Sequence, residues 1–326
     1  MYQKNRGFIM IRFGCAARSF IFALLFAGSG SSALAYDLPV VNLGATSFVD
    51  GLPPAGAGWY FTEYLQRYDS DRFNDKDGHP LPLPKTEAAF DISLTQLAYI
   101  GDVDVLGGKL GFVAMVPSVI NEDVDDGINN MALNASSGVG DLLIAPAILW
   151  APVMGAEGPV FAHRLELQFI LPTGKYDKSN TINPGSNHWS FNPYWAGTYW
   201  VSPKWTASWR LHYLLNGTNN DPSVSYGPGV NSVKPGQALH ANFATSYELN
   251  RAFRIGLNGY WLRQISDTEI NGDSVSGRKE KVWAVGPGAV LSFSKDDHIF
   301  ANAYFERGAE NRSEGNRFQL RWVHHF

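Results

Sequence analysis

Residues 316–326 read NRFQLRWVHHF and alternate between apolar and polar side chains. One face carries Phe318, Leu320, Trp322 and Phe326, and the other carries Arg317, Gln319, Arg321 and His325. Because successive side chains of a strand point to opposite faces, this period of two predicts a β-strand. The stretch also has the length of a tilted strand that crosses a bilayer, about 9–11 residues. An edge strand of a soluble β-sandwich is the alternative that this stretch alone leaves open.

The same alternation recurs upstream and predicts further strands. It is clearest at 204–215, where the apolar Trp209 and Leu211 flank Arg210, and at 252–265. The twelve predicted strands are 59–69, 88–100, 109–118, 139–150, 160–172, 191–201, 204–215, 237–249, 252–265, 281–294, 297–307 and 316–326.

The connections between these strands alternate in length. Short ones follow every second strand, at 101–108, 152–159, 202–203, 250–251 and 295–296. Longer, polar ones lie at 70–87, 119–138, 173–190, 216–236, 266–280 and 308–315. A soluble sandwich has no reason for this order, whereas an outer-membrane barrel has short periplasmic turns and long extracellular loops. We therefore predict an all-β fold, a transmembrane antiparallel β-barrel of about 12 strands, with both termini on the periplasmic side.

The last strand also carries a resemblance. Phe318, Leu320, Trp322 and Phe326 resemble the C-terminal sorting signal of outer-membrane β-barrels, which ends in Phe after alternating apolar residues. This resemblance implies that the barrel assembly machinery and outer-membrane lipid are partners of the chain.

The N-terminal residues have the composition of a secretory signal peptide. Basic residues precede a short apolar run at 20–27, and Ala33-Leu34-Ala35 is a small-x-small cleavage site. We predict a signal peptide at 1–35 that is cleaved after Ala35, with Met10 as an alternative start. Residues 36–58 are rich in Gly and Pro and are predicted to form a periplasmic lead-in or a lumenal plug, followed by the barrel at 59–326.

Charge and cysteine content exclude several classes of function. Cleavage removes four of the 26 basic residues and none of the 30 acidic ones, which leaves an acidic mature chain. Nucleic acid is excluded as a partner, because phosphates require a basic surface. The single cysteine, Cys15, lies in the signal peptide, so neither disulfides nor thiol chemistry is expected. We expect no cofactor.

Polar residues on the predicted inner face are the candidate lumen-lining residues. They are Arg164, Glu166, Gln168, Arg210, His212, His240, Asn242, Arg254, Asn258, Tyr260, Arg317 and Arg321, together with Gln319. Such groups either line a water path or pair with one another to fill the lumen. Glu166 is expected to pair across strands with Arg321 or Arg254. A salt-bridge network and a selectivity filter both remain open.

Two other kinds of chemistry have weaker support. His188-Trp189-Ser190 is the nearest approach to a lipid-hydrolysing Ser–His pair, which needs the base within hydrogen-bond reach of the hydroxyl. The loop acids Asp69, Asp71, Asp75, Asp77, Asp123, Asp125 and Asp126 offer oxygen ligands. Their spacing does not match the helix–loop–helix calcium pattern, and we interpret them as solvated. His324 and His325 point to opposite faces. We therefore predict no catalytic residue and no metal site.

Four short motifs are similar to those of a known family. They are GATSF at 44–48, GLPPAG at 51–56, GVGDL at 138–142 and LPTGKY at 171–176. The chain resembles the family of outer-membrane proteins named after the meta-pathway of phenol degradation. The resemblance implies an outer-membrane protein associated with the uptake of aromatic or other hydrophobic compounds. We predict a passive channel for such small molecules, without any catalysed reaction. Trp189, Tyr194, Tyr260 and Tyr304 are expected to give weak binding. A lipid-hydrolysing barrel and a structural barrel remain the alternatives.

Overall fold

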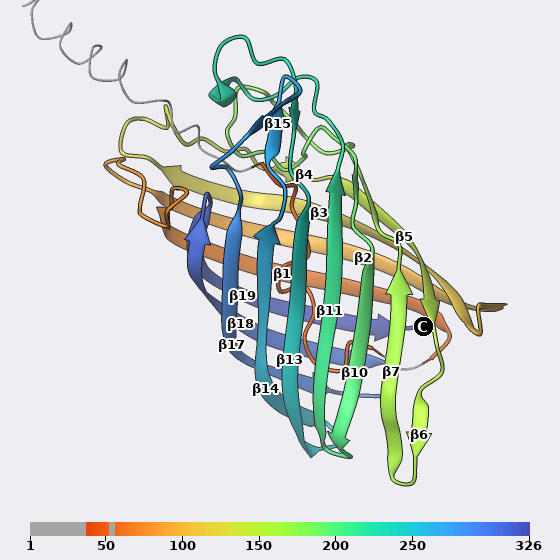
Figure 1. Ribbon diagram of the computed structural model, residues 1–326. Helices are drawn as coiled ribbons and strands as arrows, with labels where there is room; N and C mark the ends of the chain where they lie inside the picture. Colours follow the sequence, from red (N-terminus) through yellow and green to blue (C-terminus); the bar gives the residue numbers. More distant parts are fainter. Residues whose placement is uncertain (1–36, 52–55) are drawn as a thin grey trace, which may run out of the picture. The chain divides into compact units, whose positions relative to one another are not determined.

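The alternating segments pair into one antiparallel sheet that closes on itself in the computed structural model (Figure 1). The structure describes residues 37–51 and 56–326, which belong to the larger of the chain's two compact units, Leu34–Phe326. The predicted signal peptide and its cleavage site lie outside the described residues. Closure is made by the first and last strands, which pair from Tyr60↔His325 to Phe73↔Ser313.

The elements in chain order are β1 Gly58–Phe73, β2 Glu87–Val105, β3 Gly108–Asp125, β4 Gly138–Val139, β5 Leu142–Leu149, β6 Val153–Gly155, β7 Gly158–Glu166, β8 Phe169–Leu171, β9 Ser190–Phe191, β10 Tyr194–Ser202, β11 Trp205–Asn216, the 3-10 helix η1 Val224–Tyr226, β12 Val233–Lys234, β13 Ala238–Asn250, β14 Phe253–Gln264, β15 Thr268–Ile270, β16 Asp273–Val275, β17 Lys281–Ser292, β18 Asp297–Glu310 and β19 Ser313–His325.

Several of these segments are parts of one barrel strand. The fourth strand is divided into β4, β5 and β6, the fifth into β7 and β8, and the sixth into β9 and β10. The sixteen segments of the sheet therefore form the twelve antiparallel barrel strands that the sequence predicted, and this prediction is confirmed. No helix among the described residues is long and apolar enough to cross a membrane, a finding that does not bear on crossing by strands.

Some strands extend beyond their predicted ends. β3 continues to Asp125 where the prediction ended at 118, and β2 continues to Val105. The apolar alternation stops earlier than the backbone pairing, which goes on through polar residues as far as Glu87↔Asp125. The long loops also contain a small sheet of β12, β15 and β16 that the sequence analysis missed. These strands are two or three residues long, too short for a detectable alternation.

The two ends of the barrel differ as the loop lengths predicted. We call the end with the short connections the turn end and the other the loop end; in Figure 1 β6 marks the turn end and β15 the loop end. The β2–β3 turn is tight, with Leu106 and Gly107 both at positive φ, which suits the twist of a hairpin. β1 begins and β19 ends at the turn end, because Tyr60 pairs with His325.

Side chains separate between the two faces of the wall. Phe318, Leu320, Trp322 and Phe326 are exposed, as expected for an outward face, whereas Gln319 and Arg321 between them are buried. The same separation holds in β11, where Trp205 and Leu211 are exposed and Arg210 is buried. The outward face is thus apolar where lipid would contact it, and the polar groups are directed inward.

Residues 37–51, which we call the N-terminal segment, pack against the inward face. Leu38 and Leu43 join a cluster with Tyr260 and Tyr304. Ala45 lies in a second cluster with Tyr64 and Met115, and Phe48 in a third with Tyr60 and Phe300. Three of the four buried apolar clusters among the described residues therefore include this segment.

The N-terminal segment runs from the loop end to the turn end. Asp37 contacts Arg278 and Thr268, which belong to the long connection between β14 and β17. Gly51 donates to Thr198 of β10, near the turn end. The prediction of both termini at one end is correct for β1 and β19 but wrong for Asp37. The prediction rested on the alternation of short and long connections between strands. That alternation contains no information about a segment that does not join the sheet.

Candidate functional site

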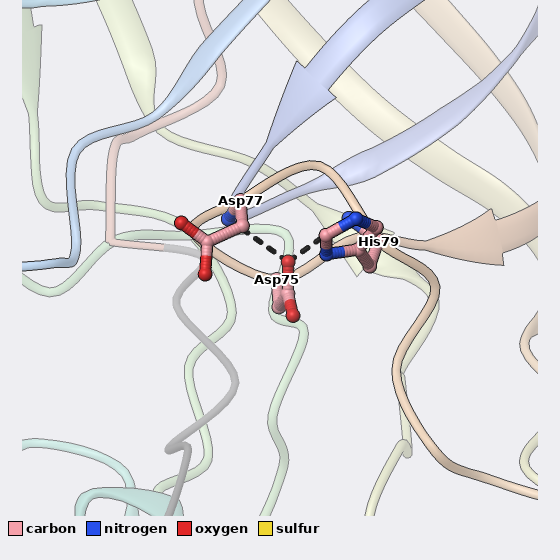
Figure 2. Close-up of side chains that lie close together, drawn as sticks. All are labelled: Asp75, Asp77 and His79. Carbon is pink, nitrogen blue, oxygen red and sulfur yellow. Dashed lines mark hydrogen bonds between the residues drawn. The ribbon is translucent and has the colours of Figure 1, made fainter.

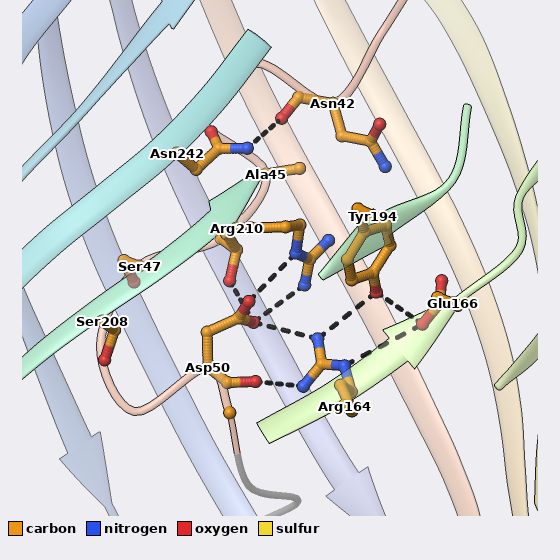
Figure 3. A network of polar contacts seen from close by, with 12 residues as sticks. Asn42, Ala45, Ser47, Asp50, Arg164, Glu166, Tyr194, Ser208, Arg210 and Asn242 are labelled. Atoms are coloured by element: carbon orange, nitrogen blue, oxygen red, sulfur yellow. Dashed lines mark hydrogen bonds and ion pairs between the residues drawn. The ribbon is translucent and has the colours of Figure 1, made fainter. Parts of the chain in front are cut away.

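Asp50 connects the N-terminal segment to the barrel wall through two arginines (Figure 3). Its carboxylate accepts hydrogen bonds from Nε and Nη2 of Arg210 at 2.9 and 2.8 Å, and from Nη2 of Arg164 at 3.1 Å. Arg164 also donates to the backbone carbonyl of Asp50, and Thr46 donates to the carboxylate. Asp50 and Arg210 are both buried. This is the arrangement in which a buried charge is tolerated, because it is paired and hydrogen-bonded.

Glu166 completes this group of charges. Tyr194 donates to its carboxylate at 2.5 Å, and Nε of Arg164 lies 3.9 Å away. The expected pairing of Glu166 with Arg321 or Arg254 is wrong. Glu166 ends β7, whose neighbours in the sheet are β5, β6 and β10, and neither arginine lies on those strands.

Inward polar side chains of β13, β18 and β19 hold the middle of the N-terminal segment. Asn242 of β13 accepts from the backbone N–H of Gly44 at 2.7 Å and donates to the carbonyl of Asn42 at 2.9 Å. Tyr304 of β18 donates to the carbonyl of Gly44 at 2.9 Å. Arg317 and Arg321 of β19 donate to the carbonyls of Leu43 and Ala45 at 2.5 and 3.4 Å. A segment outside the sheet thus has its backbone polar groups satisfied by inward side chains.

The remaining candidates lie in three places. Gln168, His212 and His240 surround Asn192, and the two imidazole rings stack at 4.0 Å between centroids. Arg254 pairs with Glu248 at 2.8 Å near the turn end. Asn258 and Tyr260 are buried on β14, where Tyr260 donates to Glu306 at 2.7 Å. All the candidates are buried except Arg164 and Arg317, which are partly buried.

A cavity of about 150 Å³ lies between the N-terminal segment and the strands on one side of the barrel. We call it the lumen cavity. Its apolar lining includes Phe48, Tyr60, Tyr64, Met115 and Phe300. Its polar lining includes Arg164, Glu166, Gln168, Tyr194, Arg210 and Arg321. The lining continues past Ile100 and Leu149, towards the turn end.

Part of this lining is predictable from the sequence, and the rest is not. Asp50 and Phe48 were missed because they belong to a segment without any periodic pattern. Tyr60, Tyr64 and Phe300 alternate correctly along their strands, but period alone does not say which inward residues face a cavity. Of the aromatic candidates, Tyr194 lines the cavity, Tyr260 and Tyr304 pack at 5.2 Å from one another, and Trp189 is exposed.

A second buried charge cluster fixes the start of the N-terminal segment. We call Asp37, Arg278, Glu280 and Arg312 the N-terminal latch. Arg278 donates to both oxygens of Asp37 at 2.6 and 3.0 Å. Glu280 accepts from the backbone N–H groups of Asp37 and Leu38 at 2.9 Å, and Arg312 lies 3.3 Å from it. Burial raises the pKa of Glu280 to about 7, while the charge of Arg312 acts in the opposite direction.

The Ser–His arrangement needed for hydrolysis is not formed by His188 and Ser190. Nδ1 of His188 lies 2.9 Å from the carbonyl of Ser186, whereas the hydroxyl of Ser190 donates to Asn216 at 2.8 Å. Among the described residues, no hydrogen bond joins His188 to Ser190. The geometry does not favour a nucleophile at Ser190.

Asp75, Asp77 and His79 lie close together in the first long loop (Figure 2). Asp75 accepts from the backbone N–H groups of Asp77 and His79, both at 2.9 Å, and these bonds lower the pKa of the Asp75 carboxyl. Asp77 pairs with Lys76 at 2.5 Å, and both side chains are exposed. The backbone bonds are those of an Asx turn, which accounts for the close approach without an ion.

Comparison with known proteins identifies the fold and the family. Over 86% of its length the chain is similar to all of the COG4313 outer membrane channel from Pseudomonas putida F1, at 16% identity and a TM-score of 0.74. It is also similar to the translocator domain of the autotransporter NalP from Neisseria meningitidis, at 10% identity and a TM-score of 0.53, over 87% of this chain and 94% of that one. No relative was found among curated proteins. A family model matches residues 70–322, which confirms the resemblance seen in the sequence, and the chain belongs to the family described as "Putative MetA-pathway of phenol degradation".

Proposed function

We propose that this protein is an outer-membrane channel for the passive uptake of small aromatic or hydrophobic compounds. The lumen cavity carries the proposal, because a cavity of about 150 Å³ can hold one benzene ring. Its lining supplies aromatic faces from Phe48, Tyr64 and Phe300 and a few polar groups, which is the usual composition of a small-molecule site. Membership of a family named after phenol degradation supports the same class of cargo.

The N-terminal segment acts as a plug in this proposal. It occupies the barrel interior and is held by Asp50 at one end and by the N-terminal latch at the other. Passage of a solute beyond the lumen cavity requires the segment to shift. Deletion of residues 40–56 is expected to raise the permeability for all small solutes. An unchanged permeability in a correctly folded deletion variant would show that the segment does not restrict passage.

The proposed location is the bacterial outer membrane, reached through a cleaved signal peptide. The apolar outward face and the fold of an outer-membrane channel support it. Sequencing the N-terminus of the protein isolated from membranes is the direct test. Tyr36 as the first residue agrees with cleavage after Ala35, and an intact residue 1 or 10 would contradict it.

Solute entry into liposomes tests the transport itself. Refolded protein is incorporated into liposomes, and the entry of a labelled single-ring aromatic is compared with that of a sugar of similar size. Faster entry of the aromatic than in protein-free liposomes, without faster entry of the sugar, is the expected result. Equal entry of both solutes indicates a general porin, and entry of neither above the control contradicts transport of these solutes.

A further inference from the structure

We propose that the lumen cavity binds small aromatic carboxylates, and that Arg321 of β19 is the residue that recognises the carboxylate. This inference rests on the proposed function and narrows it from aromatic compounds to aromatic anions. It arises from the charges that line the cavity and from the surroundings of one guanidinium group.

The charges in the cavity lining do not balance. Three arginines line it, Arg164, Arg210 and Arg321, against two carboxylates, Asp50 and Glu166. Arg164 and Arg210 share Asp50, and Arg164 also approaches Glu166. Tyr194 donates to the same oxygen of Glu166. Both carboxylates therefore have their partners within this group, and with three cations against two anions the lining retains one positive charge.

That charge belongs to Arg321. In the part of the chain that the structure describes, Arg321 forms no ion pair, and its one hydrogen bond is a long one of 3.4 Å to the carbonyl of Ala45. Its Nε is buried without a hydrogen-bond partner. The residue is 7% exposed. A buried cation without a counterion is costly, so an anion that enters the cavity gains a strong partner there.

Aromatic rings surround the same guanidinium group. Its central carbon lies 3.7 Å from the ring centroid of Phe300 and 5.9 Å from that of Tyr64. Both rings also line the lumen cavity. An aromatic acid matches this arrangement, because its carboxylate can accept charge-assisted hydrogen bonds from Arg321 while its ring packs against apolar side chains. The cavity volume limits the ligand to about one ring.

Benzoate and benzamide are the matched probes, because they have nearly the same size and differ in charge. Their binding to the refolded mature protein in detergent is measured by calorimetry, with acetate as the anion that lacks a ring. We expect benzoate to bind more tightly than both others. Arg321→Gln is expected to weaken benzoate by about tenfold or more, the scale of one charge-assisted pair, and to leave benzamide unchanged. Arg321→Lys should retain part of the preference.

Arg317→Gln is the matched control. Arg317 lies four residues away on the same strand and also donates to a backbone carbonyl of the N-terminal segment, but it does not line the cavity. It should keep the preference for benzoate over benzamide. The ratio of the two affinities within one variant does not depend on the fraction of protein that is folded, so a partly folded variant still gives an answer.

Several results would overturn the assignment. They are benzamide or acetate binding as tightly as benzoate, no detectable benzoate binding to the wild type, an unchanged affinity ratio in Arg321→Gln, or an equal loss of preference in Arg317→Gln. The proposed function is tested separately, by measuring the entry of the neutral benzyl alcohol into liposomes that contain the protein. Faster entry of benzyl alcohol without a benzoate preference leaves the channel proposal standing and removes only the assignment to anions.

Discussion

Asp50 and Arg210 are 160 residues apart in the chain, yet two hydrogen bonds of 2.8 and 2.9 Å join their side chains inside the barrel. Together with Arg164 they attach the N-terminal segment to β7 and β11 inside the barrel. Both side chains are buried, so separating them would leave two unpaired buried charges. The pair therefore links the stability of the barrel to the position of the segment.

Asp50→Asn should be strongly destabilising. It removes the one carboxylate that Arg164 and Arg210 share and leaves one buried and one partly buried guanidinium group with too few acceptors. Loss of one partner from a buried ion pair costs about 3–5 kcal/mol in the free energy of unfolding. Urea titration of the refolded protein measures this change, and single-channel conductance should rise because the segment is released.

Asp71→Asn is the control for that substitution. Asp71 lies 3.5 Å from Arg72 at the loop end, where its side chain is 82% exposed. An exposed pair contributes about 0–1 kcal/mol, so this variant should unfold almost like the wild type. Equal effects of the two substitutions would mean that the Asp50 pairs contribute no more than a surface contact.

Gly44→Ala should destabilise the protein through two separable effects. Gly44 has φ +75°, and a Cβ there would lie 3.0 Å from the ring of Tyr304. The positive φ costs an L-residue about 1–2 kcal/mol, and the crowding adds to this. Gly107→Ala isolates the first effect, since Gly107 has φ +77° with nothing within 4 Å of the added atom. The free energy of unfolding should fall further for Gly44→Ala, and equal losses would contradict the crowding.

Features set by neighbouring residues can be predicted from this sequence, whereas features set by residues far apart in the chain cannot. The faces of β19 are set by local alternation, so the outward position of Trp322 and the inward position of Arg321 follow from sequence alone. The end of β3 does not, because backbone pairing continues through Asp123 and Asp125 after the apolar pattern has stopped. Polar residues are as compatible with a strand that extends into water as with a loop, so the sequence does not show where β3 ends.

The lumen cavity shows the same limit. Alternation places Arg164 and Arg210 on inward faces, but it contains no information about their partner. Asp50 lies in a segment without a period, and it meets both arginines only after the barrel has closed. The cavity itself depends on where that segment rests, so its lining was beyond any pattern in the strands. The Gly- and Pro-rich composition of 36–58 and the family motifs at 44–48 and 51–56 pointed to this segment, but they contain no information about its partners.

The stability of the protein should depend on pH through Glu280 of the N-terminal latch. Burial raises the pKa of Glu280 from its ordinary 4.5 to about 7. Between these values Glu280 keeps a proton in the folded protein that the unfolded chain has released, so the contribution of Glu280 to stability is largest below pH 4.5 and falls as the pH rises towards 7. The change is about 3 kcal/mol across that interval and ends above it.

Thermal unfolding at a series of pH values checks this prediction. The difference in stability between the wild type and Glu280→Gln should change by about 3 kcal/mol between pH 4.5 and about 7, because the amide does not titrate. Arg312→Gln should shift the fall in stability to higher pH, since the charge of Arg312 lowers the pKa of Glu280. A slope that is unchanged in Glu280→Gln would assign the pH dependence to another group.

Phe326→Ala should impair assembly in cells more than folding in vitro. Phe326 follows β19 and is 72% exposed, with its backbone N–H donating to the carbonyl of Trp59 at 3.0 Å. Its ring packs on His324 and contributes little to the interior, so truncation should change the free energy of unfolding by no more than about 0.5 kcal/mol. The resemblance to a sorting signal predicts a different role for the ring, recognition by the assembly machinery. The amount of heat-modifiable protein in the outer membrane should therefore fall for Phe326→Ala but not for Phe305→Ala, an outward phenylalanine of β18 that is 39% exposed. Equal loss of membrane protein in both variants would indicate a general need for outward aromatic residues, and the last residue would then have no special part in assembly.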